Sequence, residues 1–335
     1  MLYEDVLALN ECELIPCNQR EDEEHWLETR KSGIGGSDAG AIMGLNKFAS
    51  PLSVYLSKKG IASTESNDYM AYGHRMEPVI RDWTREDLGV EIEEVPGMFK
   101  SRNIEFMNAN LDGLIYLPEE KEIAGVPLIG LGGHEIKTSS GDGFTYDEIP
   151  DSYYCQVQHY MAVTGLEWFV LTVHINGSPR LIHYAILRNS DFIEKLISCE
   201  TDFWENYYLK NVSPIPGGNQ NETDMVKSLP MPETVSLPDE YECVFADYDE
   251  IKMQISNLEK SADAIKNAIL MKISEYNTDA VSADRTTATC GPWKVTYNLQ
   301  TKSSLDTDAL KKAGIYSMYL KKISSKVMRI TRSSK

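Results

Sequence analysis

Three polar side chains stand in two apolar, strand-like runs, and their types could support metal-dependent hydrolysis. The run over residues 106–116 contains Asp112, and the run over residues 128–138 contains Glu135 and Lys137. Residues two apart in a strand point to the same face, so Glu135 and Lys137 should share one side of the second run. If the two runs pair in one sheet, Asp112 can join them there.

These charges need an explanation, because a buried carboxylate or ammonium is costly unless it is paired or binds a metal. One interpretation is a buried salt bridge between Lys137 and either acid, although one lysine balances only one of two carboxylates. The other is an oxygen-rich site for Mg²⁺ or Mn²⁺, formed by Asp112 and Glu135 beside Lys137. Such a site suits phosphodiester hydrolysis, because the metal polarises the phosphoryl oxygen and activates the attacking water.

A glycine-rich turn near the N-terminus suggests an anion site. A predicted helix over residues 21–30 ends before this turn, Gly33-Ile34-Gly35-Gly36. Ser37 is the candidate N-cap of a second predicted helix over residues 38–45. Glycines that lead into a helix N-terminus expose backbone N–H groups and a partial positive charge. A simple joint between two helices explains the same pattern, so both interpretations stay open on the residues alone.

The motifs, taken in order, resemble those of one nuclease family. Residues 30–39, RKSGIGGSDA, and their continuation over 46–60 resemble the opening motif of phage λ-exonuclease-type and YqaJ-like viral recombinase nucleases. Asp112 followed by Glu135-Ile136-Lys137 is similar to the D…(D/E)-x-K signature of the restriction-endonuclease-like PD-(D/E)XK superfamily. Two further motifs agree, the G-x-x-x-E pattern over residues 73–77 and the Q-x-x-x-Y pattern over residues 156–160. The resemblance covers about residues 25–210.

The resemblance implies a metal site and the roles of the residues around it. Asp112 and Glu135, with the Ile136 carbonyl, would hold one or two Mg²⁺ ions, with Mn²⁺ as the alternative metal. Lys137 would orient the attacking water and offset developing charge. Two more residues would complete the catalytic site at its edge, Glu77 and Gln156.

The same resemblance implies an activity and partners. Arg30 and Ser37 would hold the 5′-phosphate of a DNA end, and Tyr160 would contact the substrate. The enzyme would be an exodeoxyribonuclease that degrades one strand of linear double-stranded DNA 5′→3′, leaving 3′ single-stranded tails for phage recombination. Family members form homotrimeric rings and work with a single-strand annealing protein. Two alternatives remain: a structure-dependent or restriction-type endonuclease of this fold, and a non-catalytic phage protein that binds DNA ends.

The predicted elements give an α/β fold with three regions. Residues 1–210 are expected to form the nuclease domain, a mixed central sheet flanked by helices. Residues 211–240 are rich in proline and predict a linker. Residues 241–335 predict a helix-plus-β extension with a long amphipathic helix, a hairpin and a basic tail. Over residues 245–276 apolar residues recur at spacings of three and four, so that helix should pack against this chain or a neighbouring copy.

Further predicted elements position the motifs. Glu77 lies in a predicted helix over residues 69–87, where Pro78 should kink the helix or sit in its first turn. Gln156 lies in a predicted helix over residues 152–165. A turn over residues 118–127 is predicted to join the runs over 106–116 and 128–138. Further along the chain, strands are predicted over 168–173 and 181–186, and a helix over 191–209.

Composition excludes several classes of protein. The chain has 335 residues, of which 42% are hydrophobic and 25% charged, and no apolar run long enough for a membrane helix. The N-terminus lacks the basic region of a signal peptide, so we expect a cytoplasmic protein in a bacterial host cell. Six scattered cysteines suggest no zinc ribbon, disulfide framework or iron–sulfur cluster.

The charge of the chain is uneven. The net charge is −18, yet residues 301–335 carry nine basic and two acidic residues, a net +7. A metal-dependent nuclease can be acidic overall, because phosphate contacts need only a local basic patch. Either a DNA contact or a solvated face would explain the basic tail.

Overall fold

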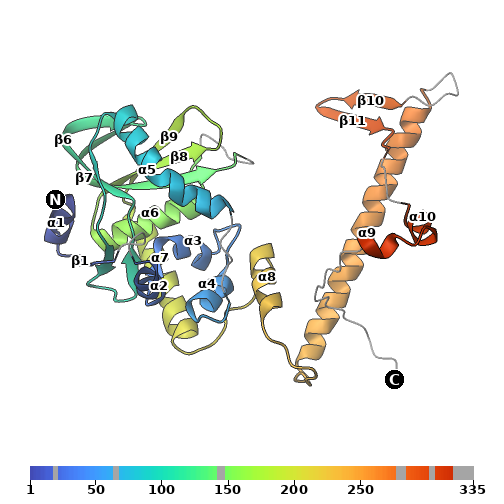
Figure 1. The fold of residues 1–335 in the computed structure, drawn as a ribbon, viewed down its shortest axis with the longest axis horizontal. Coiled ribbons are helices and arrows are strands. Elements are labelled where there is room, and N and C mark those ends of the chain that lie inside the picture. Colours follow the sequence, from blue (N-terminus) through green and yellow to red (C-terminus); the bar gives the residue numbers. More distant parts are fainter. Residues whose placement is uncertain (18–21, 63–67, 142–147, 277–283, 302–305, 320–335) are drawn as a thin grey trace. The chain divides into compact units, whose positions relative to one another are not determined.

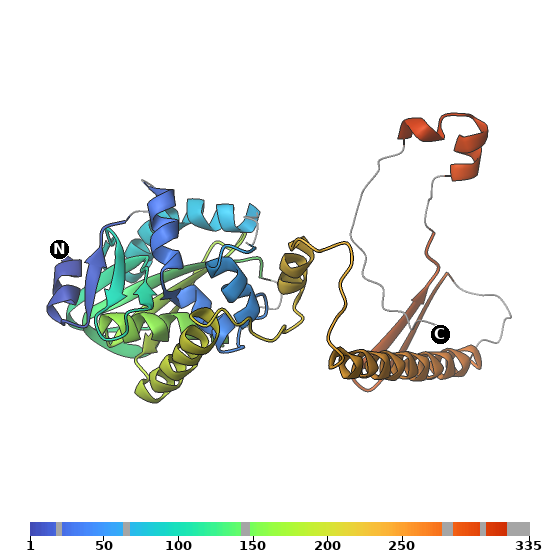
Figure 2. The ribbon, with the colours of Figure 1, turned by 90° about the horizontal axis from the view of Figure 1, so that it is seen from below.

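The computed structural model divides the chain into two compact units, Met1–Pro230 (unit 1) and Met231–Lys335 (unit 2), which we describe separately. Figures 1 and 2 show their elements in two views. Every residue predicted for the catalytic site or the anion site belongs to unit 1. The structure describes residues 1–17, 22–62, 68–141, 148–276, 284–301 and 306–319.

A five-stranded mixed sheet is the larger β-structure of unit 1, in the order β3-β6-β7-β8-β9. Strand β6 pairs with β7 antiparallel, β7 pairs with β8 in parallel, and β8 pairs with β9 antiparallel. The two kinds of pairing in one sheet confirm the predicted α/β class with a mixed central sheet. The strands are β3 (Ile92–Glu93), β6 (Gly113–Ile123), β7 (Val126–Ser139), β8 (Trp168–Ile175) and β9 (Leu181–Leu187).

Two helices flank this sheet on opposite faces. On one face, Thr172 of β8 contacts Thr84 of α5 (Asp68–Leu88). On the other face, the neighbouring Leu171 of β8 belongs to the same hydrophobic cluster as Tyr160 of α6 (Asp151–Thr164). Successive strand residues point to opposite faces, so α5 and α6 lie on the two sides of the sheet. The flanking helices predicted around the sheet are thereby confirmed.

A smaller four-stranded sheet packs against α6 as well. Its order is β1 (Cys12–Ile15), β4 (Met98–Ser101), β5 (Met107–Ala109) and β2 (Ile34–Gly35). The two-residue strand β2 pairs in parallel with β5, which fixes the start of the glycine-rich turn to this sheet. The remaining helices of unit 1 are α1 (Leu2–Ala8), α2 (Glu23–Lys31), α3 (Gly36–Ile42), α4 (Pro51–Lys58), α7 (Ser190–Asp202), the π-helix η1 (Phe203–Tyr208) and α8 (Gln220–Ser228).

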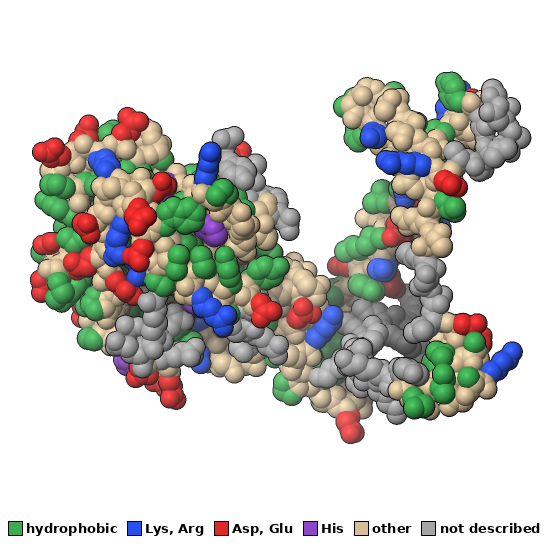
Figure 3. Space-filling model, turned by 45° about the horizontal axis from the view of Figure 1, so that its top comes forward, with side chains coloured by type: hydrophobic (Ala, Val, Ile, Leu, Met, Phe, Trp, Pro, Cys, Tyr) green, Lys and Arg blue, Asp and Glu red, His purple; other side chains and the backbone are tan. Residues whose placement is uncertain are grey.

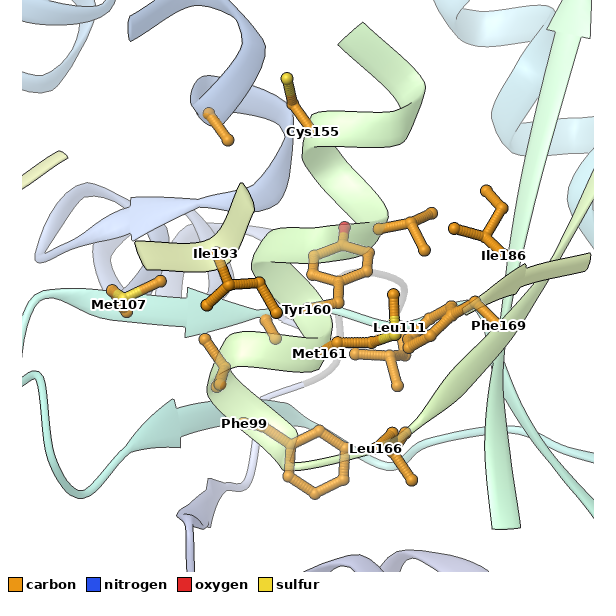
Figure 4. Close-up of a cluster of buried hydrophobic side chains, with 14 of the residues drawn as sticks. Phe99, Met107, Leu111, Cys155, Tyr160, Met161, Leu166, Phe169, Ile186 and Ile193 are labelled. Atoms are coloured by element: carbon orange, nitrogen blue, oxygen red, sulfur yellow. The ribbon is translucent and has the colours of Figure 1, made fainter. Parts of the chain in front are cut away.

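The main core of unit 1 surrounds α6, which carries buried side chains on several sides. Figure 4 shows Tyr160 and Met161 of α6 beside Phe169 of the large sheet, with Phe99 and Met107 of the small sheet nearby. These side chains are at most 4% exposed. The helix is therefore held from two sheets at once, and any polar residue on it has a fixed position.

The strand-like run predicted over residues 106–116 is two strands in two different sheets, so that single-strand prediction is wrong. Strand β5 ends at Ala109 in the small sheet, and β6 begins at Gly113 in the large one. The chain crosses between the sheets at Asn110–Asp112. Alternation of apolar residues continues through the crossing because both strands are buried, and periodicity alone does not reveal it.

The turn predicted over residues 118–127 is also shorter than expected. Strand β6 continues past Pro118, where the pairing with β7 shifts register between Leu117 and Lys121. Such an irregularity accommodates a proline, which has no N–H to donate to the ladder. The chain reverses at Ala124-Gly125, where both residues have positive φ angles of 50° and 79°.

The helix and strand predictions around the motifs agree with α5, α6, β8 and β9. Pro78 lies inside α5, and the helix continues past this proline to Leu88. The region predicted as a helix over 191–209 is α7 followed by η1. The N-cap prediction for Ser37 is wrong, because α3 begins at Gly36 with Gly35 as its N-cap.

The region predicted as a linker over residues 211–240 contains a helix that packs on unit 1. Glu222 of α8 is 1% exposed and accepts hydrogen bonds from the Ser50 hydroxyl and from the backbone N–H of Gly218. Met225 of α8 joins the buried cluster around α4. The prolines and polar spacers therefore include an ordered segment, since buried contacts made by two residues anchor it.

Unit 2 contains the long helix and the hairpin that the sequence predicts, followed by a short helix. Helix α9 (Tyr241–Ser274) is followed by strands β10 (Arg285–Cys290) and β11 (Trp293–Asn298), α10 (Thr307–Lys312) and the 3₁₀ turn η2 (Tyr316–Tyr319). The large apolar residues of the predicted stripe are 40–70% exposed: Ile251, Ile255, Leu258, Ile265 and Ile269. The predicted basic tail lies almost wholly outside the described residues. None of the helices in the described ranges combines the length and apolarity that a membrane span requires.

Candidate active site

Asp112 and Glu135 meet at the start of β6. Gly113 pairs with His134 across the antiparallel strands β6 and β7, which brings residues 112 and 135 next to each other. The backbone N–H of Ile136 donates a hydrogen bond of 2.8 Å to Asp112 Oδ2. The Glu135 carboxylate is also close enough to act electrostatically on Asp112. The predicted pairing of the two runs is thus present, and Asp112 reaches the site from the crossing between the sheets.

Burial makes these two acids hard to ionise together. Removal from water, followed by repulsion from the Glu135 carboxylate, raises the pKa of Asp112 to about 8. Burial also raises the pKa of Glu135 above its ordinary value. Asp112 therefore holds its proton at neutral pH unless a cation joins the pair.

Lys137 and Gln156 both bind the same oxygen of Glu135. Lys137 Nζ donates to Glu135 Oε1 at 2.6 Å, and Gln156 Nε2 donates to it at 2.7 Å. Burial by itself would lower the pKa of Lys137, but the Glu135 and Asp112 carboxylates outweigh it and raise the pKa. Lys137 is therefore a charged ammonium, and it balances one of the two acids.

The donor atoms that remain suit a small divalent ion. Glu135 Oε2 is buried and receives no hydrogen bond from a donor in the described residues. Mg²⁺ is usually bound through one or two carboxylates, with water completing its coordination. No three His, Cys, Asp or Glu side chains converge in the described ranges, so no larger ligand cluster competes with this pair. Asp112 and Glu135 fit Mg²⁺ or Mn²⁺, and the role of the Ile136 carbonyl stays a prediction.

Glu77 lies at the edge of this group and is bound by an arginine. Arg81 of α5 is 4% exposed; its Nη2 contacts Glu77 Oε1 at 2.8 Å, and its Nη1 contacts Glu94 Oε2 at 3.0 Å. Glu77 is near enough to raise the pKa of Glu135, although burial is the larger cause. The structure thus places a third acid within electrostatic range of the pair.

Tyr160 does not lie where a DNA contact was predicted. Its side chain is 4% exposed in the core (Figure 4), and its hydroxyl accepts a 2.8 Å hydrogen bond from Gln156 Nε2. Burial and the nearby acids raise the pKa of Tyr160 far above its ordinary value, so it stays a neutral phenol. A buried ring has no surface for a bound strand, and we assign Tyr160 to orienting Gln156 instead.

Arg30 and Ser37 face each other across the glycine-rich turn. Arg30 Nη2 donates to Ser37 Oγ at 2.6 Å, and the guanidinium lies 5.2 Å from the centre of the Trp26 ring. Ser37 is exposed and Arg30 half-buried. Figure 3 shows acidic and basic side chains interspersed over one face of unit 1, so a local cationic group is compatible with the negative net charge of the chain. This arrangement can bind an anion.

The two sites are connected through Gly36. A Cβ atom added at Gly36 would lie 2.5 Å from the Tyr160 ring and 3.0 Å from Gln156 Cγ. We predict that Gly36→Ala lowers the free energy of unfolding by about 1–3 kcal/mol, because overpacking forces these side chains to move. Gly35→Ala is the matched control, since the nearest atom to its Cβ is 3.8 Å away. Urea unfolding measures both variants, and equal stability of the two would contradict the close packing at Gly36.

Comparisons with known proteins agree with the resemblance found in the sequence. Residues 25–167 match the family described as the YqaJ-like viral recombinase domain. This range holds the glycine-rich turn, both acids, Lys137 and Gln156. We call residues 25–167 the YqaJ-like domain, after the family that they resemble. The protein called YqaJ, an uncharacterized protein of Bacillus subtilis (strain 168), is 29% identical over 279 residues, which cover 79% of this chain and 83% of YqaJ.

Part of the chain also resembles solved structures. An alkaline exonuclease from Laribacter hongkongensis, LHK-Exo, is 22% identical and matches 56% of this chain and 96% of its own, with a TM-score of 0.45. LHK-Exo in complex with dAMP gives 20% identity, the same share of this chain, 94% of its own and a TM-score of 0.46. A phage-related exonuclease from Haemophilus somnus 129PT is 16% identical over 54% of this chain and 95% of its own, with a TM-score of 0.41.

The YqaJ-like domain also holds charged residues that the sequence analysis did not single out. Arg81 binds the predicted site residue Glu77. Arg81 follows Glu77 by four residues in the same helix, and this spacing could have predicted the contact. Lys58 and Asp38 form a buried ion pair of 2.8 Å beside the glycine-rich turn. No local spacing links these two, because they belong to different helices.

Proposed function

We propose that this protein is a Mg²⁺- or Mn²⁺-dependent exodeoxyribonuclease that degrades one strand of linear double-stranded DNA from the 5′ end. The observation that carries the proposal is the convergence of Asp112, Glu135 and Lys137 within residues 25–167, the YqaJ-like domain. Lys137 balances only one of the two acids, so the second acid ionises fully only when another cation joins the pair. A structural salt bridge does not need that second acid, whereas a divalent ion does.

The side chains have separate tasks in this proposal. Asp112 and Glu135 would hold the ion, which supplies a polarised phosphoryl oxygen and a lowered pKa of water when bound. Lys137 would hold the attacking water next to the scissile phosphate and offset the negative charge that develops there. Gln156 fixes the Glu135 carboxylate by donating to its Oε1, and Tyr160 fixes Gln156.

An assay on labelled linear duplex DNA tests the proposal directly. Linear DNA labelled at either the 5′ or the 3′ end is incubated with and without Mg²⁺, and acid-soluble label is followed in time. We expect release that depends on Mg²⁺, with 5′ label released first. Release of 3′ label first would overturn the polarity. No release with Mg²⁺ or Mn²⁺ would favour the non-catalytic alternative, a phage protein that binds DNA ends.

The rival enzyme is an endonuclease of the same fold. Closed circular duplex separates the two, because an end-dependent enzyme spares the circle and digests the linear form. The proposed products, 3′ single-stranded tails, are substrates for a single-strand annealing protein in phage recombination. A homotrimeric ring around the DNA is part of the same proposal, and sedimentation of the purified chain would test it.

Arg30 should determine the preference for the terminal group. We predict that Arg30→Gln lowers affinity for 5′-phosphorylated duplex by about 10–100-fold while affinity for a 5′-hydroxyl duplex is unchanged, because a charge-assisted hydrogen bond to the phosphate is lost. Lys31→Gln is the matched control, since it removes the same charge from an exposed neighbour on α2. Fluorescence anisotropy with the two duplexes measures the ratio. An unchanged preference in Arg30→Gln would remove Arg30 from the phosphate site.

A further inference from the structure

Lys58 lies under the glycine-rich turn with all of its donors engaged. Its side chain is 5% exposed, and Nζ contacts Asp38 Oδ2 at 2.8 Å. The same ammonium donates to the carbonyl oxygens of Gly33, at 2.5 Å, and Arg30, at 3.3 Å. A lysine has three N–H donors, so these three acceptors saturate it. Lys58 is the last residue of α4, and its ammonium binds backbone carbonyl groups at the start of the glycine-rich turn.

Asp38 holds the other end of the same turn. Its Oδ2 accepts a hydrogen bond of 3.0 Å from the backbone N–H of Gly35. Burial alone would raise the pKa of Asp38, but Lys58 and Arg30 outweigh it, so the carboxylate is ionised. Together Lys58 and Asp38 fix the backbone before and after Ile34, and Arg30 and Ser37 lie at the two ends of this segment.

The small sheet also restricts the backbone of the glycine-rich turn. A Cβ atom at Gly33 would lie 2.5 Å from Asn108 Nδ2 and 2.5 Å from the Phe106 carbonyl oxygen. Ile34 pairs with Met107 in the small sheet. The backbone is thus held between the sheet on one side and Lys58 on the other, which leaves a single position for the segment between Arg30 and Ser37.

The charge of the pair matters as much as its geometry. Asp38 follows Ser37 directly and carries a negative charge that would repel a phosphate bound there. The buried Lys58 ammonium, 2.8 Å away, cancels that charge. Without Lys58, the negative charge of Asp38 would offset the positive charge of Arg30. A phosphate monoester dianion would then bind weakly at this site.

We propose that Lys58 and Asp38 are positioning residues for a site that takes a terminal phosphate monoester, and that Lys58 makes this site available by fixing the turn and neutralising Asp38. The inference rests on the proposed role of Arg30 and Ser37 and extends it to a pair behind them. The pair does not contact the phosphate. Loss of Lys58 therefore weakens recognition of the phosphorylated end and leaves binding of the rest of the duplex intact.

The experiment compares binding of 5′-phosphorylated and 5′-hydroxyl duplexes in a Glu135→Gln background, so that cleavage does not interfere. We expect Lys58→Met to lose about tenfold or more of its affinity for the phosphorylated duplex, with little change for the hydroxyl duplex. Asp38→Asn added to Lys58→Met should restore part of the loss, because it removes the uncompensated charge. Lys59→Met is the control, since that ammonium binds Asn211 and lies over the Tyr208 ring instead.

Each outcome decides the inference. A Lys58→Met protein with the phosphate preference of the parent protein would overturn it. A parent protein with no preference would overturn the Arg30–Ser37 phosphate site, and this inference with it. If Lys58→Met does not fold, Lys58→Arg replaces it. Lys58→Arg should reduce the preference, because a planar guanidinium cannot bind the same three acceptors. A preference equal to the parent in this variant would also reject the proposal.

Discussion

Replacing Lys137 by methionine is expected to reduce nucleotide release by about 10²–10⁴-fold while binding to duplex ends in the presence of Mg²⁺ changes little. Methionine keeps most of the volume of the side chain but removes the ammonium that lies 2.6 Å from Glu135 Oε1. In the proposed reaction this ammonium orients water and offsets charge that develops during the attack. It should therefore affect turnover far more than the affinity for DNA.

The controls for this prediction separate chemistry from folding. Lys195→Met removes an exposed lysine of α7 and should leave turnover unchanged. Circular dichroism and anisotropy with labelled duplex show whether Lys137→Met is folded and binds DNA. Release of nucleotides at the wild-type rate by a folded Lys137→Met protein would take Lys137 out of the mechanism.

Replacing Asp112 by asparagine is expected to stabilise the protein in EDTA, and increasingly so as the pH rises. The pKa of Asp112 is raised by burial, and further by Glu135, to about 8. In the unfolded chain the same carboxyl group ionises near pH 4. Between these values the folded state holds a proton that the unfolded state has lost, so stability falls with rising pH by up to about 1.4 kcal/mol per pH unit for one proton.

Asparagine removes this dependence and supplies a donor to the acid beside it. Its Oδ1 can accept from the Ile136 N–H as Asp112 does, and its Nδ2 can donate to the buried Glu135 carboxylate. The difference in Tm between Asp112→Asn and wild type should therefore widen from about pH 5 to about pH 8 and then level off. Glu86→Gln, at an exposed position of α5, should show no such widening.

Added Mg²⁺ should reverse the order of stability at pH 8. An ion that binds the folded state alone raises the wild-type Tm by mass action, whereas Asp112→Asn has lost one of its two carboxylate ligands and should not respond. Thermal unfolding with EDTA and with Mg²⁺ measures both effects without any assay of activity. If Mg²⁺ stabilised wild type and variant equally, the proposed ion site at Asp112 would be rejected.

Much of the site was accessible from the sequence because its parts are local. Glu135 and Lys137 share a face since strand side chains repeat every two residues, and Gln156 and Tyr160 share one since helix side chains three or four apart are neighbours. The helices over residues 68–88 and 151–164 follow from the same periodicities. Such patterns depend on backbone geometry alone and need no knowledge of the fold.

Only the tertiary structure decided which segments distant in the chain contact one another. Asp112 lies in a crossing between two sheets that does not break the apolar pattern, and the turn predicted over residues 118–127 is confined to Ala124-Gly125. The burial of Tyr160 depends on packing between two sheets, and the contact from Lys58 to Gly33 spans 25 positions. The sequence by itself determined which residues could do chemistry. Burial and long-range pairing decided which are charged, which touch one another, and which only support the others.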